Sequence, residues 1–432
     1  MYGGVRKVFG VENFVISWKW PNAMNQGAAQ SRIVPDHVPR ELVREFSIYN
    51  SPGLTPTPFG NPQAALYYLR EYPPIFYSPS NAYDGSGSWV VVRAEDQRRI
   101  MGDPETFSSR RGQFDETIGE HFILLPLEAD PPHHTHLRML LNPLLSPKRV
   151  DAMEADTRQR AVDLIDGFRA RGSCDVMNDF AFPFAVGVFL QFLGMSQERR
   201  DEFVSWTVDL FHRGMEERTI AVQRVMQMIQ DRIDLRRKEP TDDFVTFLLN
   251  ARIEGRPLSN NELLGIGVLL FNGGLDTVAT AIGLDLYHLA REQDDQAWLR
   301  AHPDALKPAV EELLRAYSTI TPVRRATKDN VFNGVLIKKG DAISCPSMVA
   351  NRDPAEFPDP DRVELMRENN RHAAFAYGPH RCIGSHLARR ELTIGLEEFL
   401  NRIPSFRIKE GTTPITHGGY VFGVDELVLA WD

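Results

Sequence analysis

The feature that most constrains the fold of this chain is a long apolar stretch near its centre. Within Leu263–Leu275 the only polar side chain is Asn272. The four residues 259–262 directly before it have the Ser-x-x-Glu spacing of a capping box, which opens a helix. The helical pattern continues to about Arg291, which gives a helix roughly 48 Å long. A helix that is apolar on every side is buried, so this one is expected to cross the core.

Two adjacent glycines stand in the middle of this predicted helix, in the run Gly273-Gly274-Leu275-Asp276-Thr277. Each costs about 1 kcal/mol relative to alanine inside a helix, but together they let the helix deform and let a ligand approach the backbone. Asp276 and Thr277 then bring a carboxylate and a hydroxyl into the core, which is what a proton relay needs. The plain alternative is an Asp that reaches solvent and a Thr bonded to its own backbone.

A second informative segment holds Cys382 between Gly378 and Gly384. Glycines permit tight turns, and a helical pattern follows at once, so Cys382 is predicted to lie at a helix N-terminus. Backbone N–H groups and the helix dipole stabilise a thiolate there. Such a thiolate can ligate haem iron, whereas a lone cysteine is usually a buried structural residue. The surrounding pattern favours Cys382 as a ligand of haem iron. Cys174 and Cys345 lack such surroundings and are predicted to be structural.

The overall composition excludes several classes of protein. The net charge of −9 argues against nucleic-acid binding, because phosphate contacts need a basic surface. Three widely separated cysteines predict neither a disulfide framework nor a zinc cluster, and favour a reducing cytoplasm. Residues 1–28 lack the apolar core of a signal peptide. With no run of about 18 or more apolar residues, no membrane anchor is expected.

The remaining sequence predicts one mainly α domain with small β-sheets and no internal repeat. Residues 1–60, rich in Pro, Gly and Asn, are interpreted as irregular. Alternating patterns bounded by turn-forming residues predict strands over 75–77, 89–93, 331–343 and 427–431. Helical spacing of apolar residues predicts helices over 149–171, 198–213, 216–237, 241–251 and 384–402.

These segments resemble the cytochrome P450 family, from about residue 45 to the C-terminus. Phe375–Gly384 resembles its haem-binding signature, with Ala376 where a glycine is usual, and Gly273–Thr277 resembles its oxygen-activation motif. The closest likeness is to the bacterial camphor-hydroxylating branch. The resemblance implies a triangular helical prism around a buried haem, formed by a single domain over 45–432, with an irregular arm over 1–44.

The same resemblance implies how haem b is held. Cys382 supplies the axial thiolate, and the other residues implied to contact the cofactor are His134, Arg138, Arg324, His380, Phe375 and Gly384. Carboxylates such as haem propionates favour cationic partners, arginine above all. Glu312 and Arg315 resemble the Glu-x-x-Arg pair of the family, with Arg362 as its partner, and form a structural network behind the haem.

The implied reaction is the hydroxylation of a small apolar substrate with O2, in which Asp276 and Thr277 deliver protons. The residues implied to line the substrate pocket are Phe114, Phe122, Leu269, Asn272, Gly273, Ile320, Tyr420 and Val421; plain core packing is the alternative for each. Asn272 or Tyr420 is able to hold a substrate oxygen, so a terpenoid, a norisoprenoid or a similarly compact molecule with one polar group is expected. Phe122 replaces the tyrosine of the camphor hydroxylase, which argues against camphor itself.

Electrons are expected from a ferredoxin with its NAD(P)H-dependent reductase, because this sequence shows no fused flavin or iron–sulfur module. A basic patch around the cysteine loop would steer an acidic ferredoxin; its residues are Arg367, Arg371, Arg381, Arg389 and Arg390. Several of these are alternatively buried partners of carboxylates. A haem-thiolate peroxygenase and a non-catalytic haem sensor or terpenoid binder are the competing functions, and the intact Asp276-Thr277 pair favours the monooxygenase.

Overall fold

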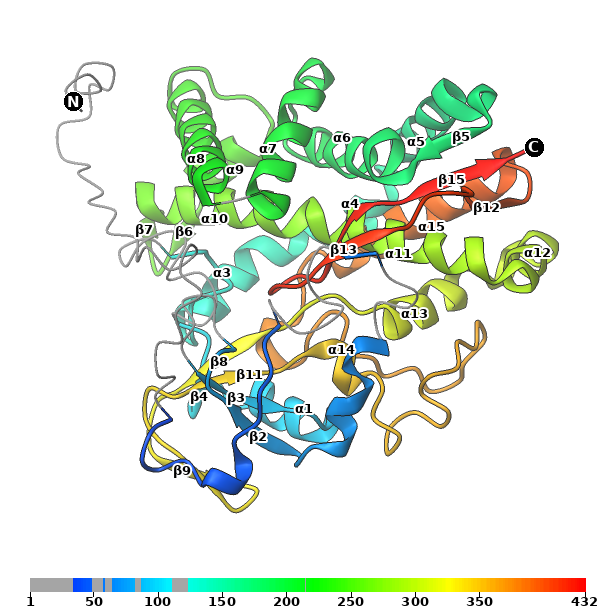
Figure 1. Cartoon of the computed structure of the whole chain (residues 1–432). Helices are drawn as coiled ribbons and strands as arrows, with labels where there is room; N and C mark the ends of the chain where they lie inside the picture. Colours follow the sequence, from blue (N-terminus) through cyan, green and yellow to red (C-terminus); the bar gives the residue numbers. More distant parts are fainter. Residues whose placement is uncertain (1–33, 49–56, 59–63, 82–86, 111–122, 214) are drawn as a thin grey trace, which may run out of the picture.

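The long apolar stretch forms two helices joined end to end, α10 (Asn260–Gly274) and α11 (Asp276–Arg291), which cross the middle of the molecule (Figure 1). The computed structural model describes residues 34–48, 57–58, 64–81, 87–110, 123–213 and 215–432. The predicted capping box is present: the Ser259 hydroxyl accepts the N–H of Glu262, and the Glu262 carboxylate accepts the N–H of Ser259.

The prediction of one unbroken helix is wrong at Leu275, where the helical hydrogen bonding is interrupted. The Thr277 hydroxyl donates a 3.0 Å hydrogen bond to the carbonyl of Gly273, four residues earlier. Back-bonding of this kind bends helices, and the preceding glycine pair offers little resistance to the bend. The break therefore lies at the motif in which the sequence places its acid and alcohol.

Helix α11 packs against α6, α13 and α15, and α10 packs against α8. Figure 1 shows α5 to α9 on one side of the α10–α11 axis and the largest sheet on the other. The remaining helices are α1 (Ala94–Gly102), α3 (His133–Leu141), α4 (Pro147–Asp151), α5 (Glu154–Phe168), α6 (Phe182–Phe192), α7 (Arg200–His212), α8 (Met215–Lys238), α9 (Phe244–Asn250), α12 (Gln293–Ala301), α13 (Leu306–Ala316), α14 (Ser347–Ala350) and α15 (Ser385–Arg402).

The strands form small sheets, as expected. The five-stranded sheet has the order β2 (Ile75–Ser78), β3 (Ser88–Val91), β11 (Ala342–Ser344), β8 (Val323–Ala326) and β4 (Phe107–Ser108). Two three-stranded sheets contain β1 (Thr57–Pro58), β13 (Ile415–His417) and β14 (Gly423–Glu426), and β12 (Phe406–Ile408), β15 (Val428–Trp431) and β5 (Ser173–Asp175). Two hairpins pair β9 (Asn330–Phe332) with β10 (Val335–Ile337) and β6 (Arg252–Ile253) with β7 (Arg256–Pro257).

The predicted mainly α fold with small sheets is confirmed, and most predicted elements match within a few residues. The expected helix over 149–171 is instead α4 followed by α5, with a break at 152–153. The N-terminal arm was predicted over residues 1–44, and its last described part contacts the rest of the fold. Val38 is buried against the five-stranded sheet, and Val43 bridges to Tyr77. Residues 1–33 of that arm lie outside the described residues.

By length and composition alone, the α10–α11 segment would suffice to cross a membrane. Of its most apolar window, however, 67% is buried inside the protein. The segment is therefore the core helix that its sequence predicts, and its apolar character is satisfied by packing within the fold.

Candidate active site

A cavity of about 710 Å³ lies against the break between α10 and α11. Its walls are mostly apolar, and they are contributed by segments far apart in the sequence. The described candidate residues all line this cavity: His134, Arg138, Leu269, Asn272, Gly273, Asp276, Thr277, Ile320, Arg324, Phe375, His380, Cys382, Gly384, Tyr420 and Val421. The remaining two, Phe114 and Phe122, lie outside the described residues.

The cysteine loop is fixed by its backbone. The N–H of Cys382 donates to the carbonyl of Phe375 at 2.9 Å, which closes the loop. Gly378 has φ +69°, and a Cβ there would lie 2.3 Å from the carbonyl oxygen of Met101, so only glycine fits. Ala376 also has a positive φ, +55°, which is the physical reason why glycine is usual at this place.

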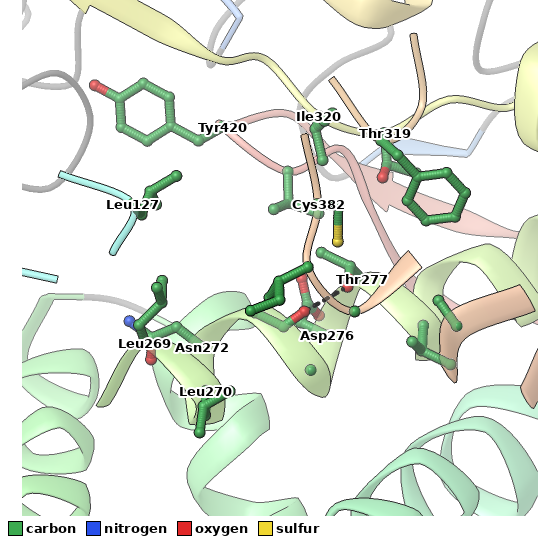
Figure 2. Close-up of a pocket in the computed structure, with 18 of the residues that line it drawn as sticks. Leu127, Leu269, Leu270, Asn272, Asp276, Thr277, Thr319, Ile320, Cys382 and Tyr420 are labelled. Carbon is green, nitrogen blue, oxygen red and sulfur yellow. Dashed lines mark hydrogen bonds between the residues drawn. The ribbon is translucent and has the colours of Figure 1, made fainter. Parts of the chain in front are cut away.

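Cys382 lies three residues before Ser385, the first residue of α15, and is exposed to the cavity that it lines. Figure 2 shows its sulfur pointing toward the helix segment that carries Asp276 and Thr277. Burial among protein atoms raises the pKa of the thiol, while the N–H of Gly384 and the guanidinium groups of Arg138 and others oppose that rise. A positive ion at the sulfur would favour the thiolate further.

Four basic side chains converge on the same cavity from separate elements. His134 and Arg138 come from α3, Arg324 from β8 and His380 from the cysteine loop. The rings of His134 and His380 lie 4.0 Å apart between centroids. Both ring nitrogens of His134 and Nε2 of His380 are buried without a hydrogen-bond partner. Buried polar atoms are nearly always paired, so this group of side chains is incomplete in the protein alone.

The electrostatics of this basic group point to an anionic ligand. Burial and the neighbouring Arg138 lower the pKa of His134 to about 4. Burial, and then Arg324, lower the pKa of His380 to about 2. A carboxylate placed among these side chains would satisfy their donors and relieve their mutual repulsion. The residues present therefore fit a prosthetic group that carries carboxylates and an iron near Cys382.

Asp276 and Thr277 open α11, beside the helix break. The Asp276 side chain is fully buried; its Oδ1 lies 2.7 Å from Nε2 of His212, and its Oδ2 has no hydrogen-bond partner. The Thr277 hydroxyl bonds to the Gly273 carbonyl, as the plain alternative expected, yet it also faces the cavity (Figure 2). The expectation that the acid reaches solvent is not met, because Asp276 is paired inside the protein.

The substrate side of the cavity is apolar except for a few groups. Leu269 and Asn272 lie on α10, and Ile320 lies on another wall of the cavity (Figure 2). Ile320 forms an isolated β-bridge with Val421, which joins two segments about a hundred residues apart in sequence. Oδ1 of Asn272 is buried without a hydrogen-bond partner. A buried amide oxygen of this kind is costly unless a ligand supplies a donor.

The predicted Glu312 network needs a correction. Glu312 and Arg315 are fully buried and form a bidentate pair, as expected. The second cation on Glu312 is Arg367, whose Nε lies 3.1 Å from both carboxylate oxygens. Arg362 is exposed and contributes only its backbone carbonyl, which accepts from Arg315 at 3.0 Å. The prediction that the Arg362 side chain completes the network is wrong.

The expected basic patch is also smaller than predicted. Arg367 is bound to Glu312, Arg389 donates to Glu311 and lies over the Phe375 ring, and Arg390 pairs with acidic residues on α4 and α5. These three are internal partners of carboxylates, which was the alternative for them. Arg371 and Arg381 are exposed.

Sequence reasoning missed three residues of the site. His212, at the end of α7, lies between Asp276 and Asp425, and His417 contacts the same Asp425. These three residues and Asp276 all line the cavity. No motif marks them, because His212 and Asp425 are 213 positions apart and meet only in the fold.

Comparison with known proteins finds one family. The family model described as Cytochrome P450 matches residues 188–418. "Probable cytochrome P450 127A1" from Sinorhizobium fredii is 54% identical over 92% of this chain and 97% of its own length. "Mycinamicin IV hydroxylase/epoxidase" from Micromonospora griseorubida is 33% identical over 80% and 90%. The crystal structure of cytochrome P450 CYP101C1 superposes with a TM-score of 0.84, at 32% identity, covering 93% of this chain and all of that one.

Proposed function

The chain belongs to the cytochrome P450 family and is a haem-thiolate monooxygenase, and on this premise we propose that it hydroxylates a compact apolar molecule with one polar group, supplied with electrons by a ferredoxin. Terpenoids and norisoprenoids are the substrate class that we favour. The observation that carries the proposal is the single cavity that Cys382, the basic group and the Asp276-Thr277 pair share with an apolar wall.

Different residues are proposed to hold the iron and the carboxylates of the cofactor. In this proposal Cys382 ligates the iron, while His134, Arg138, Arg324 and His380 bind the propionates. When bound, the haem supplies the reductive activation of dioxygen. Phe375 and Gly384 flank the cysteine and line the cofactor side of the cavity.

Asp276 and Thr277 are proposed to deliver the protons that the reaction consumes. Asp276 is buried beside the cavity, with one carboxylate oxygen paired and the other without a partner. Thr277 is its neighbour on the same first turn of α11, and its hydroxyl is both a donor and an acceptor. A carboxyl group next to a hydroxyl passes a proton inward while the surrounding apolar wall excludes bulk water.

The apolar wall and Asn272 together favour the substrate class. Cavities of about 300–1,000 Å³ bind small molecules mainly through buried apolar surface, and this one has to accommodate the haem as well. Little room therefore remains for a large substrate. The unpartnered Oδ1 of Asn272 accepts a substrate hydroxyl, and after rotation the amide donates to a carbonyl.

A matched ligand series tests this substrate assignment. Binding of cyclic hydrocarbons, and of the alcohol or ketone with the same skeleton, is followed by the spin-state change of the ferric haem. The oxygenated ligand of each pair is expected to bind more tightly, and Asn272→Leu is expected to remove about 1–3 kcal/mol of that preference, roughly 5- to 150-fold in affinity. Leu269→Val is the control for altered shape. A preference unchanged in Asn272→Leu would show that Asn272 does not recognise the substrate.

Turnover assays separate the competing functions. Product formed with NADPH, a reductase and a ferredoxin, but not with peroxide alone, supports the monooxygenase with a ferredoxin partner. Efficient turnover with peroxide alone would indicate a peroxygenase. Ligand binding without turnover in either system would indicate a sensor or a carrier. The exposed Arg371 and Arg381 support an acidic partner, and the three free cysteines support a cytoplasmic location.

A further inference from the structure

His212 is held between two carboxylates at the edge of the cavity. Its Nε2 lies 2.7 Å from Oδ1 of Asp276 and its Nδ1 lies 2.6 Å from Oδ1 of Asp425. Only 4% of the His212 side chain is exposed, and Asp276 is fully buried. Because both ring nitrogens face carboxylate oxygens, the arrangement is satisfied when both nitrogens carry a proton, that is, by an imidazolium.

The contacts continue outward to His417. Its Nδ1 lies 3.0 Å from the same oxygen of Asp425, and its side chain and that of Asp425 are 14% and 23% exposed. A Cβ at Gly423 would lie 1.9 Å from Cε1 of His417, so glycine at 423 makes room for the ring. The chain His417–Asp425–His212–Asp276 therefore connects the partly exposed β13–β14 hairpin with the first residue of α11.

Charge favours the imidazolium form of His212. Burial disfavours a charged ring, but the two carboxylates outweigh it and raise the pKa of His212 to about 9. In turn, His212 and His417 hold the pKa of Asp425 well below its usual range, against the effect of its burial. The titratable groups beside His212 are Asp276 on α11, Asp425 on β14 and His417 on β13, whereas α6 contacts the ring with the apolar Phe182. Arg213 and Arg218 line the same cavity.

We propose that His212 is a positioning residue that holds the Asp276 carboxylate and supplies the proton that Asp276 passes on. The inference rests on the proposed role of Asp276 and Thr277. Nε2 of His212 gives its proton to Asp276 while Nδ1 keeps its own proton, hydrogen-bonded to Asp425, so the ring becomes neutral. The ring then turns over, which brings Nδ1–H to Asp276 and the bare Nε2 to Asp425. One proton that enters from solvent beside His417 and Asp425 binds to this Nε2 and restores the imidazolium.

His212, His417 and Asp425 also have the composition of a metal site. The 2.6 Å contact between Nδ1 of His212 and Oδ1 of Asp425 is nevertheless that of a charge-assisted hydrogen bond. A proton between these two atoms accounts for the contact, so the proton chain is the better assignment for this cluster.

Two substitutions of His212 separate supplying a proton from holding a charge. His212→Arg keeps a cation beside Asp276 but releases no proton near neutral pH, and His212→Gln removes the charge while keeping a hydrogen bond. In both variants we expect product per electron to fall about tenfold, less than the 10²–10⁴-fold of a lost general acid, because water substitutes in part. His302→Gln, an exposed histidine elsewhere, is the matched control.

The pH profile and a direct titration complete the test. Product per electron in the unaltered enzyme is expected to fall as pH rises through about 9, and to be insensitive to pH in His212→Arg. Histidine-selective ¹⁵N NMR of the diamagnetic ferrous carbon monoxide form is expected to show one ring titrating near that value. This measurement needs neither turnover nor a variant that folds.

Each negative result would overturn a different part of the proposal. Coupling in His212→Arg equal to that of the unaltered enzyme would overturn the role of His212 as proton source. The absence of any histidine signal with a raised pKa would overturn the imidazolium between the two acids. If Asp276→Asn remains fully coupled, the proton relay of the proposed function itself fails, whatever the His212 variants do.

Discussion

Thr277 combines a local structural contact with the chemical role that we propose for it. Its hydroxyl donates to the carbonyl of Gly273, four residues earlier, at the break between α10 and α11. That bond orients the hydroxyl along the helix and toward the cavity. A hydroxyl bonded to a backbone carbonyl still has lone pairs with which to accept a proton from elsewhere.

Removing this hydroxyl is expected to uncouple the enzyme without unfolding it. Thr277→Val keeps the side-chain shape, so haem content and the rate of electron uptake should stay near those of the unaltered protein. Product per electron should fall about five- to tenfold, and peroxide should rise correspondingly, because proton delivery loses a member. Thr277→Ser keeps the hydroxyl and is the control. Unchanged product per electron in Thr277→Val would refute the role.

At the scale of elements, the Glu312 network joins α13 to the irregular segment before the cysteine loop. Glu312 receives hydrogen bonds from Arg315, Arg367 and the N–H of Glu364. A buried carboxylate with several charge-assisted partners fixes the position of everything bonded to it. The network therefore holds the segment that leads to Cys382 against α13.

Substitutions of Arg367 and Arg362 test this network, because of these two side chains the one bonded to Glu312 is that of Arg367. Arg367→Met is expected to lower the free energy of unfolding by about 1.5–3 kcal/mol, the range for hydrogen bonds to charged groups, because Glu312 loses one buried cation and keeps Arg315. Arg362→Met should change it by no more than about 0.5 kcal/mol, because that side chain is exposed. Denaturant unfolding of the haem-loaded protein measures both. The reverse order would contradict the network as described.

The helices and loops also show how much of the structure could be predicted from the sequence. The cysteine loop, the capping box and the glycine-interrupted helix were predictable because each depends on residues within about ten positions. The choice between Arg362 and Arg367 was not, because both lie in an irregular segment where no periodicity tells which guanidinium turns inward. The packing of Val38 on the five-stranded sheet was not predicted for a related reason: its partners lie in strands that come later in the sequence.

At the scale of the whole molecule, the site is an assembly of distant segments around one helix break. Cys382 follows Thr277 by about a hundred residues, and His212 and Asp425 lie on either side of both. The candidate list from sequence contained the local motifs but not the His212–Asp425 contact, since no pattern in a single sequence relates positions so far apart. Geometry in the fold was needed to connect Asp276 with the partly exposed His417 and Asp425.

The central claim is that this cavity binds haem through Cys382, and the absorption spectrum of the ferrous carbon monoxide complex tests it most directly. The unaltered protein, Cys345→Ala and Cys174→Ala are all expected to show the red-shifted Soret band that a thiolate ligand produces, because neither of those cysteines lines the cavity. Cys382→Ser is expected to lose that band. A thiolate spectrum that survives in Cys382→Ser, or that disappears in Cys345→Ala, would contradict the account.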